Sequence, residues 1–221
     1  MWYLIVTARS LIWMLLALFS SLLLLTSLLS PSWLVAAPET ITVGNETIKF
    51  RPSLGIYAKC GKPIGNTYPI CTLLAVRGLS ADPHIYPNVW KAGTVFLAMG
   101  IFVMSLTVCT GLMSCCFQSI CKKSIFNISG AAQAIAGIFY IIAVMLYPTA
   151  WGISKVQKLC GRDASPFYPG DCSLGTGLWL AIIGTVLTFV SACLSASAEK
   201  STSSDKVQDK IYEGQTLICL T

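Results

Sequence analysis

Four long runs of apolar residues alternate with polar stretches along the chain. They cover about 11–30, 90–116, 128–148 and 175–198, and Lys91, at the outer edge of the second run, is their one charged residue. A helix of about 20 apolar residues is long enough to cross the hydrocarbon core of a bilayer. The pattern predicts four membrane-spanning helices, with loops 31–89 and 149–174 on one side and both termini on the other.

The first run has an alternative interpretation as a cleaved signal peptide, because Arg9 precedes it and Ala36-Ala37 could end it. The run is longer than the usual 7–15 residues of a signal sequence, and Pro38 would follow the cleavage site. Both features favour a retained transmembrane helix.

Composition agrees with a membrane protein. Hydrophobic residues make up 55% of the 221 residues and charged residues only 11%, whereas soluble domains carry about 25% charged residues. The formal net charge of +6 comes from basic residues spread through the loops. Nucleic-acid binding needs basic residues gathered on one face, so we expect a bilayer-embedded protein without a nucleic-acid partner.

Loop charges alone do not determine the orientation. Arg9, Lys122 and Lys123 favour the cytoplasm for the termini, yet nine of the 15 Lys and Arg residues fall on the side expected outside when Lys91, at the outer edge of the second run, is counted with the loops. Paired cysteines in those loops and the glycosylation sequon that begins at Asn45 favour an oxidising, extracellular compartment. We therefore expect a multi-pass plasma-membrane protein with both termini in the cytoplasm.

The first polar loop has its own alternating pattern. Apolar and polar residues alternate over 41–50, on both sides of Gly44-Asn45. Because Gly and Asn tolerate the positive φ of a tight turn, this segment predicts a β-hairpin. We expect a small extracellular sheet on top of the helices, and we expect its surface to carry the function.

Four cysteines lie in the predicted extracellular loops, Cys60 and Cys71 in the first and Cys160 and Cys172 in the second. The spacing favours one disulfide within each loop. Four cysteines allow three connectivities, so a pairing between the loops stays open.

Three further cysteines, Cys115, Cys116 and Cys121, lie at the expected inner membrane face beside Lys122 and Lys123. Cysteines in such a place are candidate palmitoylation sites, with free thiols as the alternative. Without a nearby His they make a poor zinc site, and we expect no metal.

The sequence contains no pattern that predicts catalysis. A lumenal thiol oxidoreductase would need a Cys-x-x-Cys motif, and the chain has none; it has no Gly-rich phosphate loop either. The single His84 lies in a loop, near Asp82 but without a third partner. We expect neither an enzyme nor a cofactor.

The third run is rich in small residues. Two pairs of small residues each share a helix face and allow close approach of another helix: Gly130 with Ala134, and Ala132 with Ala136. That helix can belong to this bundle or to a partner protein. We expect Gln133 to form an interhelical hydrogen bond.

Several short segments occur in a characteristic order. They are Ser32-Trp33-Leu34, Gly55-Ile56-Tyr57 before Cys60, Tyr147-Pro148 with Trp151-Gly152, and Cys160-Gly161 with Pro169 to Gly175. Together they resemble the lipoma HMGIC fusion partner-like tetraspan family, which is similar to the wider claudin group. Residues 122–127 and 203–208 look like the branch of its second member.

The resemblance implies a left-handed four-helix bundle capped by an antiparallel β-sheet of about four or five strands from the first loop, with the second loop beside it. It implies one tetraspan domain over 1–198. Residues 199–221 mix both charge signs with Ser and Thr, so we expect a flexible or loosely helical cytoplasmic tail there. The resemblance also marks four residues as structural signature residues, namely Trp33, Gly55, Tyr57 and Trp151.

The resemblance also implies a function, because characterised relatives are auxiliary subunits that bind channels, receptors or adhesion proteins. We expect a non-catalytic accessory protein with a transmembrane protein partner; self-association stays open. The alternative is a claudin-like adhesion or paracellular barrier protein. Thr221 at the carboxyl end fits poorly to the hydrophobic terminal residue that scaffold domains bind, which favours the accessory role.

Overall fold

The structure is a computed structural model of the whole chain. It describes residues 4–43, 46–62, 68–74, 82–83, 86–114, 119–120, 123–213 and 217–220.

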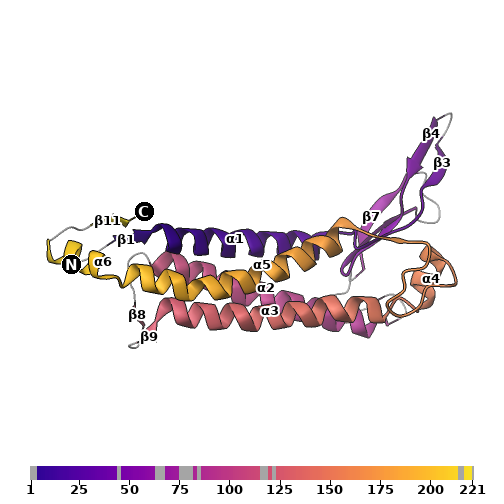
Figure 1. Cartoon of the computed structure of the whole chain (residues 1–221). Helices are drawn as coiled ribbons and strands as arrows, with labels where there is room; N and C mark the ends of the chain where they lie inside the picture. Colours follow the sequence, from indigo (N-terminus) through magenta and orange to yellow (C-terminus); the bar gives the residue numbers. More distant parts are fainter. Residues whose placement is uncertain are drawn as a thin grey trace. The chain divides into compact units, whose positions relative to one another are not determined.

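Four long apolar helices form a bundle and confirm the predicted spans (Figure 1). Each is long and apolar enough to cross a membrane. Their bounds are α1 Ala8–Leu29, α2 Asn88–Ser114, α3 Ile125–Thr149 and α5 Thr176–Thr202. Prolines mark several of these ends because they interrupt helical hydrogen bonding: Pro31 follows α1, Pro87 precedes α2 and Pro148 lies in the last turn of α3.

The chain folds as two compact units, each of which includes part of all four helices. We call residues 1–23, 99–139 and 183–221 the terminal unit, and residues 24–98 and 140–182 the sheet unit.

The terminal unit has an apolar core in which the buried rings of Trp13 and Phe126 meet edge to face, with centroids 5.3 Å apart. Ala198 from α5 completes this cluster. Short strand pairs accompany the helices: β1 Leu4–Thr7 runs parallel to β11 Leu217–Leu220, and β8 Ser119–Ile120 pairs with β9 Lys123–Ser124.

The segment after residue 198, which the sequence predicts to be flexible or loosely helical, contains helical residues. Helix α5 continues to Thr202, and α6 Asp205–Tyr212 follows it. Asp205 in the first turn and Lys210 in the last turn suit the helix dipole, and Val207 is fully buried.

The sheet unit contains a five-stranded antiparallel sheet with the order β10-β2-β5-β6-β7. The strands are β10 Ser173–Leu174, β2 Leu34–Val35, β5 Ser53–Leu54, β6 Ala58–Gly61 and β7 Ile70–Leu73. Four strands come from the first loop, as expected, but the second loop contributes β10 instead of only packing beside the sheet. Strand β10 joins because Gly175 donates its N–H to the Trp33 carbonyl at 2.8 Å, next to the β10–β2 pairing.

The predicted hairpin is present as a separate two-stranded sheet. Strands β3 Glu39–Val43 and β4 Glu46–Phe50 pair with Ile41 opposite Ile48. The predicted turn residues Gly44 and Asn45 lie outside the described part of the chain. Helix α4, Ser154–Cys160, belongs to the second loop.

Candidate interaction site

Trp33 lies immediately before β2 and is fully buried. Its indole Nε1 donates to the Ser27 carbonyl at the end of α1, at 2.8 Å. Its ring meets Tyr147 edge to face, with centroids 4.8 Å apart. Trp33 therefore joins the first span to the sheet instead of presenting its ring at the surface.

Tyr147 is the centre of an aromatic cluster at the end of α3. Its hydroxyl donates to the Leu54 carbonyl in β5 at 2.7 Å, and its ring stacks on Trp90, with centroids 5.3 Å apart. Trp90 in turn donates its Nε1 to the Tyr147 carbonyl at 3.1 Å. Trp151 is also buried, with its ring 6.0 Å from Tyr147. These contacts attach the sheet to α2 and α3 through buried aromatic surface and directed hydrogen bonds.

Two glycines allow backbone segments to approach closely. Gly55 donates its N–H to the Ala58 carbonyl at 2.7 Å, and a Cβ there would overlap the Ser30 carbonyl oxygen. A Cβ on Gly175 would overlap the Ser32 carbonyl in the same way. Tyr57 follows Gly55 by two residues and is half-buried. Its backbone carbonyl accepts a hydrogen bond from the Leu74 N–H.

Two disulfides brace the sheet unit. Cys60 and Cys71 are directly opposite each other on β6 and β7 and are bonded. Cys160 at the end of α4 is bonded to Cys172 just before β10. Each bond closes a loop of about a dozen residues, which stabilises the fold by about 3 kcal/mol in the chain-entropy model. This is the local pairing that the spacing favours.

Tyr86 shows how closely the first loop packs onto α2. Its side chain is fully buried, and its hydroxyl is hydrogen-bonded to that of Thr94. Burial raises the pKa of Tyr86, although the hydrogen bond to Thr94 acts in the opposite direction. The phenol stays neutral and keeps the end of the first loop attached to the helix.

In the terminal unit, Gln133 forms the predicted interhelical hydrogen bonds. It is fully buried, and its Oε1 accepts from Trp13 Nε1 in α1 and from Ser191 Oγ in α5, both at 3.2 Å. A Cβ on Gly130 would overlap the Ser195 hydroxyl. Here the small residues of α3 serve packing inside the bundle, which is one of the two roles that the sequence left open.

Strand β7 presents two exposed apolar side chains on the five-stranded sheet. Ile70 is 40% exposed and Leu73 50%, and Tyr68, just before the strand, is 60% exposed. Strand β7 is also an edge of the sheet and pairs with β6 on one side. Exposed edges with apolar side chains are unusual in a protein that functions alone, because they invite pairing with another chain.

Comparison with known proteins agrees with this architecture. The family model described as "Lipoma HMGIC fusion partner-like protein" matches residues 9–197. The chain belongs to this family of LHFPL tetraspan proteins.

Two relatives align over the full length of both chains. This LHFPL protein is 42% identical to the LHFPL tetraspan subfamily member 2a protein of Danio rerio. It is 41% identical to the LHFPL tetraspan subfamily member 2 protein of Homo sapiens. The LHFPL tetraspan subfamily member 5 protein of Gallus gallus is 23% identical, over 92% of this chain and 87% of its own.

The segments that carried the family resemblance in this LHFPL protein lie mostly around the junction of helices and sheet. Trp33, Gly55, Tyr147, Trp151 and Gly175 are all buried there. Sequence reasoning missed that Tyr147 is the centre of the aromatic cluster and missed Trp90 entirely. The available signal was the recurrence of aromatic residues within a few positions of the span ends.

Some predicted sites of the LHFPL protein stay predictions. The sequon residue Asn45 and the candidate palmitoylation sites Cys115, Cys116 and Cys121 lie outside the described residues. In the part of the chain that the structure describes, no three His, Cys, Asp or Glu side chains come close enough to hold a metal ion.

Proposed function

We propose that this LHFPL protein is a non-catalytic accessory subunit that binds another membrane protein, with its sheet unit outside the cell. The observation that carries the proposal is strand β7, an edge strand with the exposed apolar side chains Ile70 and Leu73. A partner that covers this strand would remove apolar surface from water and could pair with the free strand edge.

The construction of the sheet supports such a role. The disulfide Cys60–Cys71 links β7 to β6, and Tyr147 ties β5 to α3. A surface that is rigid before binding loses little conformational freedom on binding, which improves affinity. The sheet unit thus suits shape recognition.

The proposed orientation rests on the disulfides and the sequon. Disulfides persist in oxidising compartments and are rare in the cytosol. If the sheet unit is outside, Asn45 is accessible for glycosylation during synthesis. Treating the protein from cells with a glycosidase should increase its gel mobility, and Asn45→Gln should abolish the shift. A thiol-reactive, membrane-impermeant reagent that labels loop 119–124 in intact cells would contradict the orientation.

The accessory role is tested by crosslinking mass spectrometry of the tagged protein in native membranes. We expect one membrane protein to be crosslinked reproducibly, with contacts near β7. The double substitution Ile70→Thr/Leu73→Thr keeps strand propensity but removes the apolar surface, and it should reduce recovery of the partner about tenfold. The matched control is Ile48→Thr/Leu174→Thr, which removes exposed apolar side chains from β4 and β10 and should leave recovery unchanged.

Expression in cells without junctions distinguishes the accessory role from the claudin-like alternative. An accessory subunit should form no strands at cell contacts. Strand formation there, together with the absence of any crosslinked membrane partner, would contradict the proposal and favour adhesion between copies of this chain.

A further inference from the structure

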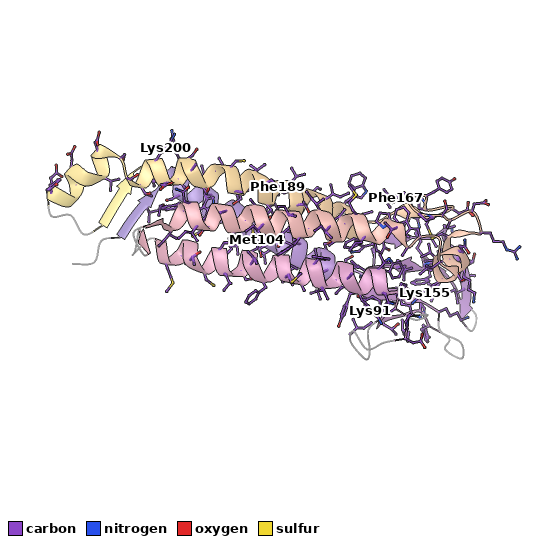
Figure 2. All side chains as sticks on the ribbon, turned by 90° about the horizontal axis from the view of Figure 1, so that it is seen from below. Lys91, Met104, Lys155, Phe167, Phe189 and Lys200 are labelled. Carbon is purple, nitrogen blue, oxygen red and sulfur yellow. A yellow bond between two sulfur atoms is a disulfide. The ribbon has the colours of Figure 1, made fainter. Side chains whose placement is uncertain are left out.

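A basic cavity lies where the first loop meets the second loop within the sheet unit. Its volume is about 470 Å³. Its lining includes the four lysines Lys59, Lys62, Lys155 and Lys158, and of the lining residues that the structure describes, Glu39 is the one acid. Figure 2 labels Lys155, which lies on α4. Four positive charges and one negative charge around one cavity leave a net positive potential there.

The lysines are held together against their mutual repulsion. Burial, together with the charge of Lys59, lowers the pKa of Lys155 from 10.5 to about 8. The Cys60–Cys71 disulfide fixes the strand that carries Lys59, and the Cys160–Cys172 disulfide fixes the helix that carries Lys155. Each side of the cavity is thus braced covalently, which restrains the backbone that carries Lys59 and Lys155.

The basic surface continues past this cavity. Lys59 and Lys62 also line a second cavity of about 260 Å³, together with Ile70 and Thr72 of β7. A ligand that uses both cavities would need several anionic groups along its length.

We propose that the lysine-lined cavity binds a sulfated oligosaccharide. Its volume lies within the range of about 300–1,000 Å³ that is usual for small-ligand sites. Apolar lining residues such as Leu54 and Leu159 offer surface for the face of a sugar ring. Four separate ammonium groups suit separate sulfates. The planar carboxylates of an acidic peptide are best bound by the fork of an Arg side chain, and no Arg is among the described residues of this lining.

This inference rests on the proposed function only for the placement of the sheet unit outside the cell. It needs no protein partner. Because Ile70 of the partner surface also lines the second cavity, the substitutions that test the saccharide are confined to lysines of α4. Failure of the saccharide to bind would leave the accessory role intact, and failure to find a partner would leave the cavity intact.

The test measures binding of a heparin oligosaccharide to the purified full chain by calorimetry, at about 0.15 M salt, where attraction between distant surface charges is largely screened. The variant Lys155→Gln/Lys158→Gln removes two charges from the cavity and should weaken binding at least about tenfold. The control Lys49→Gln/Arg162→Gln removes two exposed charges that do not line the cavity, and it should change the affinity less than about twofold. Lys158→Gln alone, at an exposed position of α4, should also weaken binding and serves as a variant with little risk to folding.

Three outcomes would overturn the proposal. The first is the absence of measurable binding by the native chain. The second is an equal loss of affinity in the cavity variant and the control variant, which would indicate attraction to overall charge. The third is equal or tighter binding of the desulfated oligosaccharide or of a poly-glutamate peptide. Tighter binding of poly-glutamate would assign the cavity to an acidic protein segment.

Discussion

The two units of this LHFPL protein are held together by different interactions. Besides the contact between Trp13 and Phe126, the terminal unit relies on small side chains and on hydrogen bonds between buried polar groups, such as Ser20 with Thr188 at 2.6 Å and Gln133 with Trp13 at 3.2 Å. The sheet unit relies on large buried aromatic rings around Tyr147 and on two disulfides. The same four helices therefore take part in two kinds of packing.

The solvent explains the difference. Between helices in lipid, apolar side chains gain little from leaving a medium as apolar as themselves, so close packing and hydrogen bonds hold helices together. A small sheet exposed to water gains from burying aromatic surface but has a core too small to be stable alone, which disulfides compensate. The comparison implies that a substitution should weaken mainly the unit that contains it.

The largest effect is expected for Trp33→Ala. Truncating a buried Trp leaves a cavity and lowers the free energy of unfolding by about 3–5 kcal/mol. Hydrogen exchange followed by mass spectrometry should show faster exchange in peptides of the sheet unit, with peptides of the terminal unit changed much less. Trp179→Ala is the control, because Trp179 is 52% exposed on α5, and its exchange should remain close to that of the native chain. Equal acceleration in both units would contradict the comparison.

Removal of the second disulfide should have the next largest effect. Cys160→Ser/Cys172→Ser should destabilise the sheet unit by about 2–4 kcal/mol, because the unfolded loop is no longer constrained. Limited proteolysis should then cleave the chain between α3 and α5. The matched control is Cys109→Ser/Cys193→Ser, which changes two free cysteines of the terminal unit and should leave the cleavage rate unchanged. Cleavage within the terminal unit in the disulfide variant would argue against separate stabilisation.

A smaller effect is expected for Gln133→Leu in the terminal unit. It removes the acceptor for Trp13 and Ser191, and hydrogen bonds between membrane helices are worth about 1 kcal/mol. Hydrogen exchange should increase modestly in α1 and α5 of this unit and stay constant in the sheet. Ser105→Ala is the control, since the exposed Ser105 bonds only the Ile101 carbonyl of its own helix.

The smallest effect concerns pH and Lys155. Below pH 8 this lysine is protonated in the folded and the unfolded chain, but between pH 8 and its ordinary pKa of 10.5 only the unfolded chain keeps the proton. The unfolded state then binds more protons, so the stability of the sheet unit rises with pH over this window. Among the neighbouring charged groups Lys59, Lys62, Lys158 and Glu39, the charge of Lys59 is a cause of the lowered pKa of Lys155, and it acts in the same direction as burial because it disfavours the protonated form.

Thermal unfolding at pH 7 and pH 9.5 measures this rise, and Lys155→Gln should abolish it. The Tyr86 phenol acts in the opposite direction only above its ordinary pKa of 10.0, outside these conditions. A rise of the same size in the Lys155→Gln variant would assign the effect to other groups.

Parts of the site could be predicted from particular residues and others could not. Cys60 and Cys71 were paired from their spacing, and the β3–β4 hairpin followed from the alternation beside Gly44-Asn45. The position of Trp90 near a span end is an ambiguous signal, because an aromatic residue there is equally typical of an interfacial ring exposed to lipid. Its stacking on Tyr147 depends on the approach of α2 to α3, which local sequence does not encode.

The sequence by itself determined the four spans and the family, since a bilayer requires about 20 apolar residues per helix and this requirement acts on each segment separately. Only the tertiary structure decided that the second loop supplies strand β10 and that Lys59 of the first loop faces the same cavity as Lys155 of the second. These contacts join residues far apart in the chain. They arise from how the helices and disulfides fold the two loops against each other, and the hydrophobic periodicity of the sequence does not predict that arrangement.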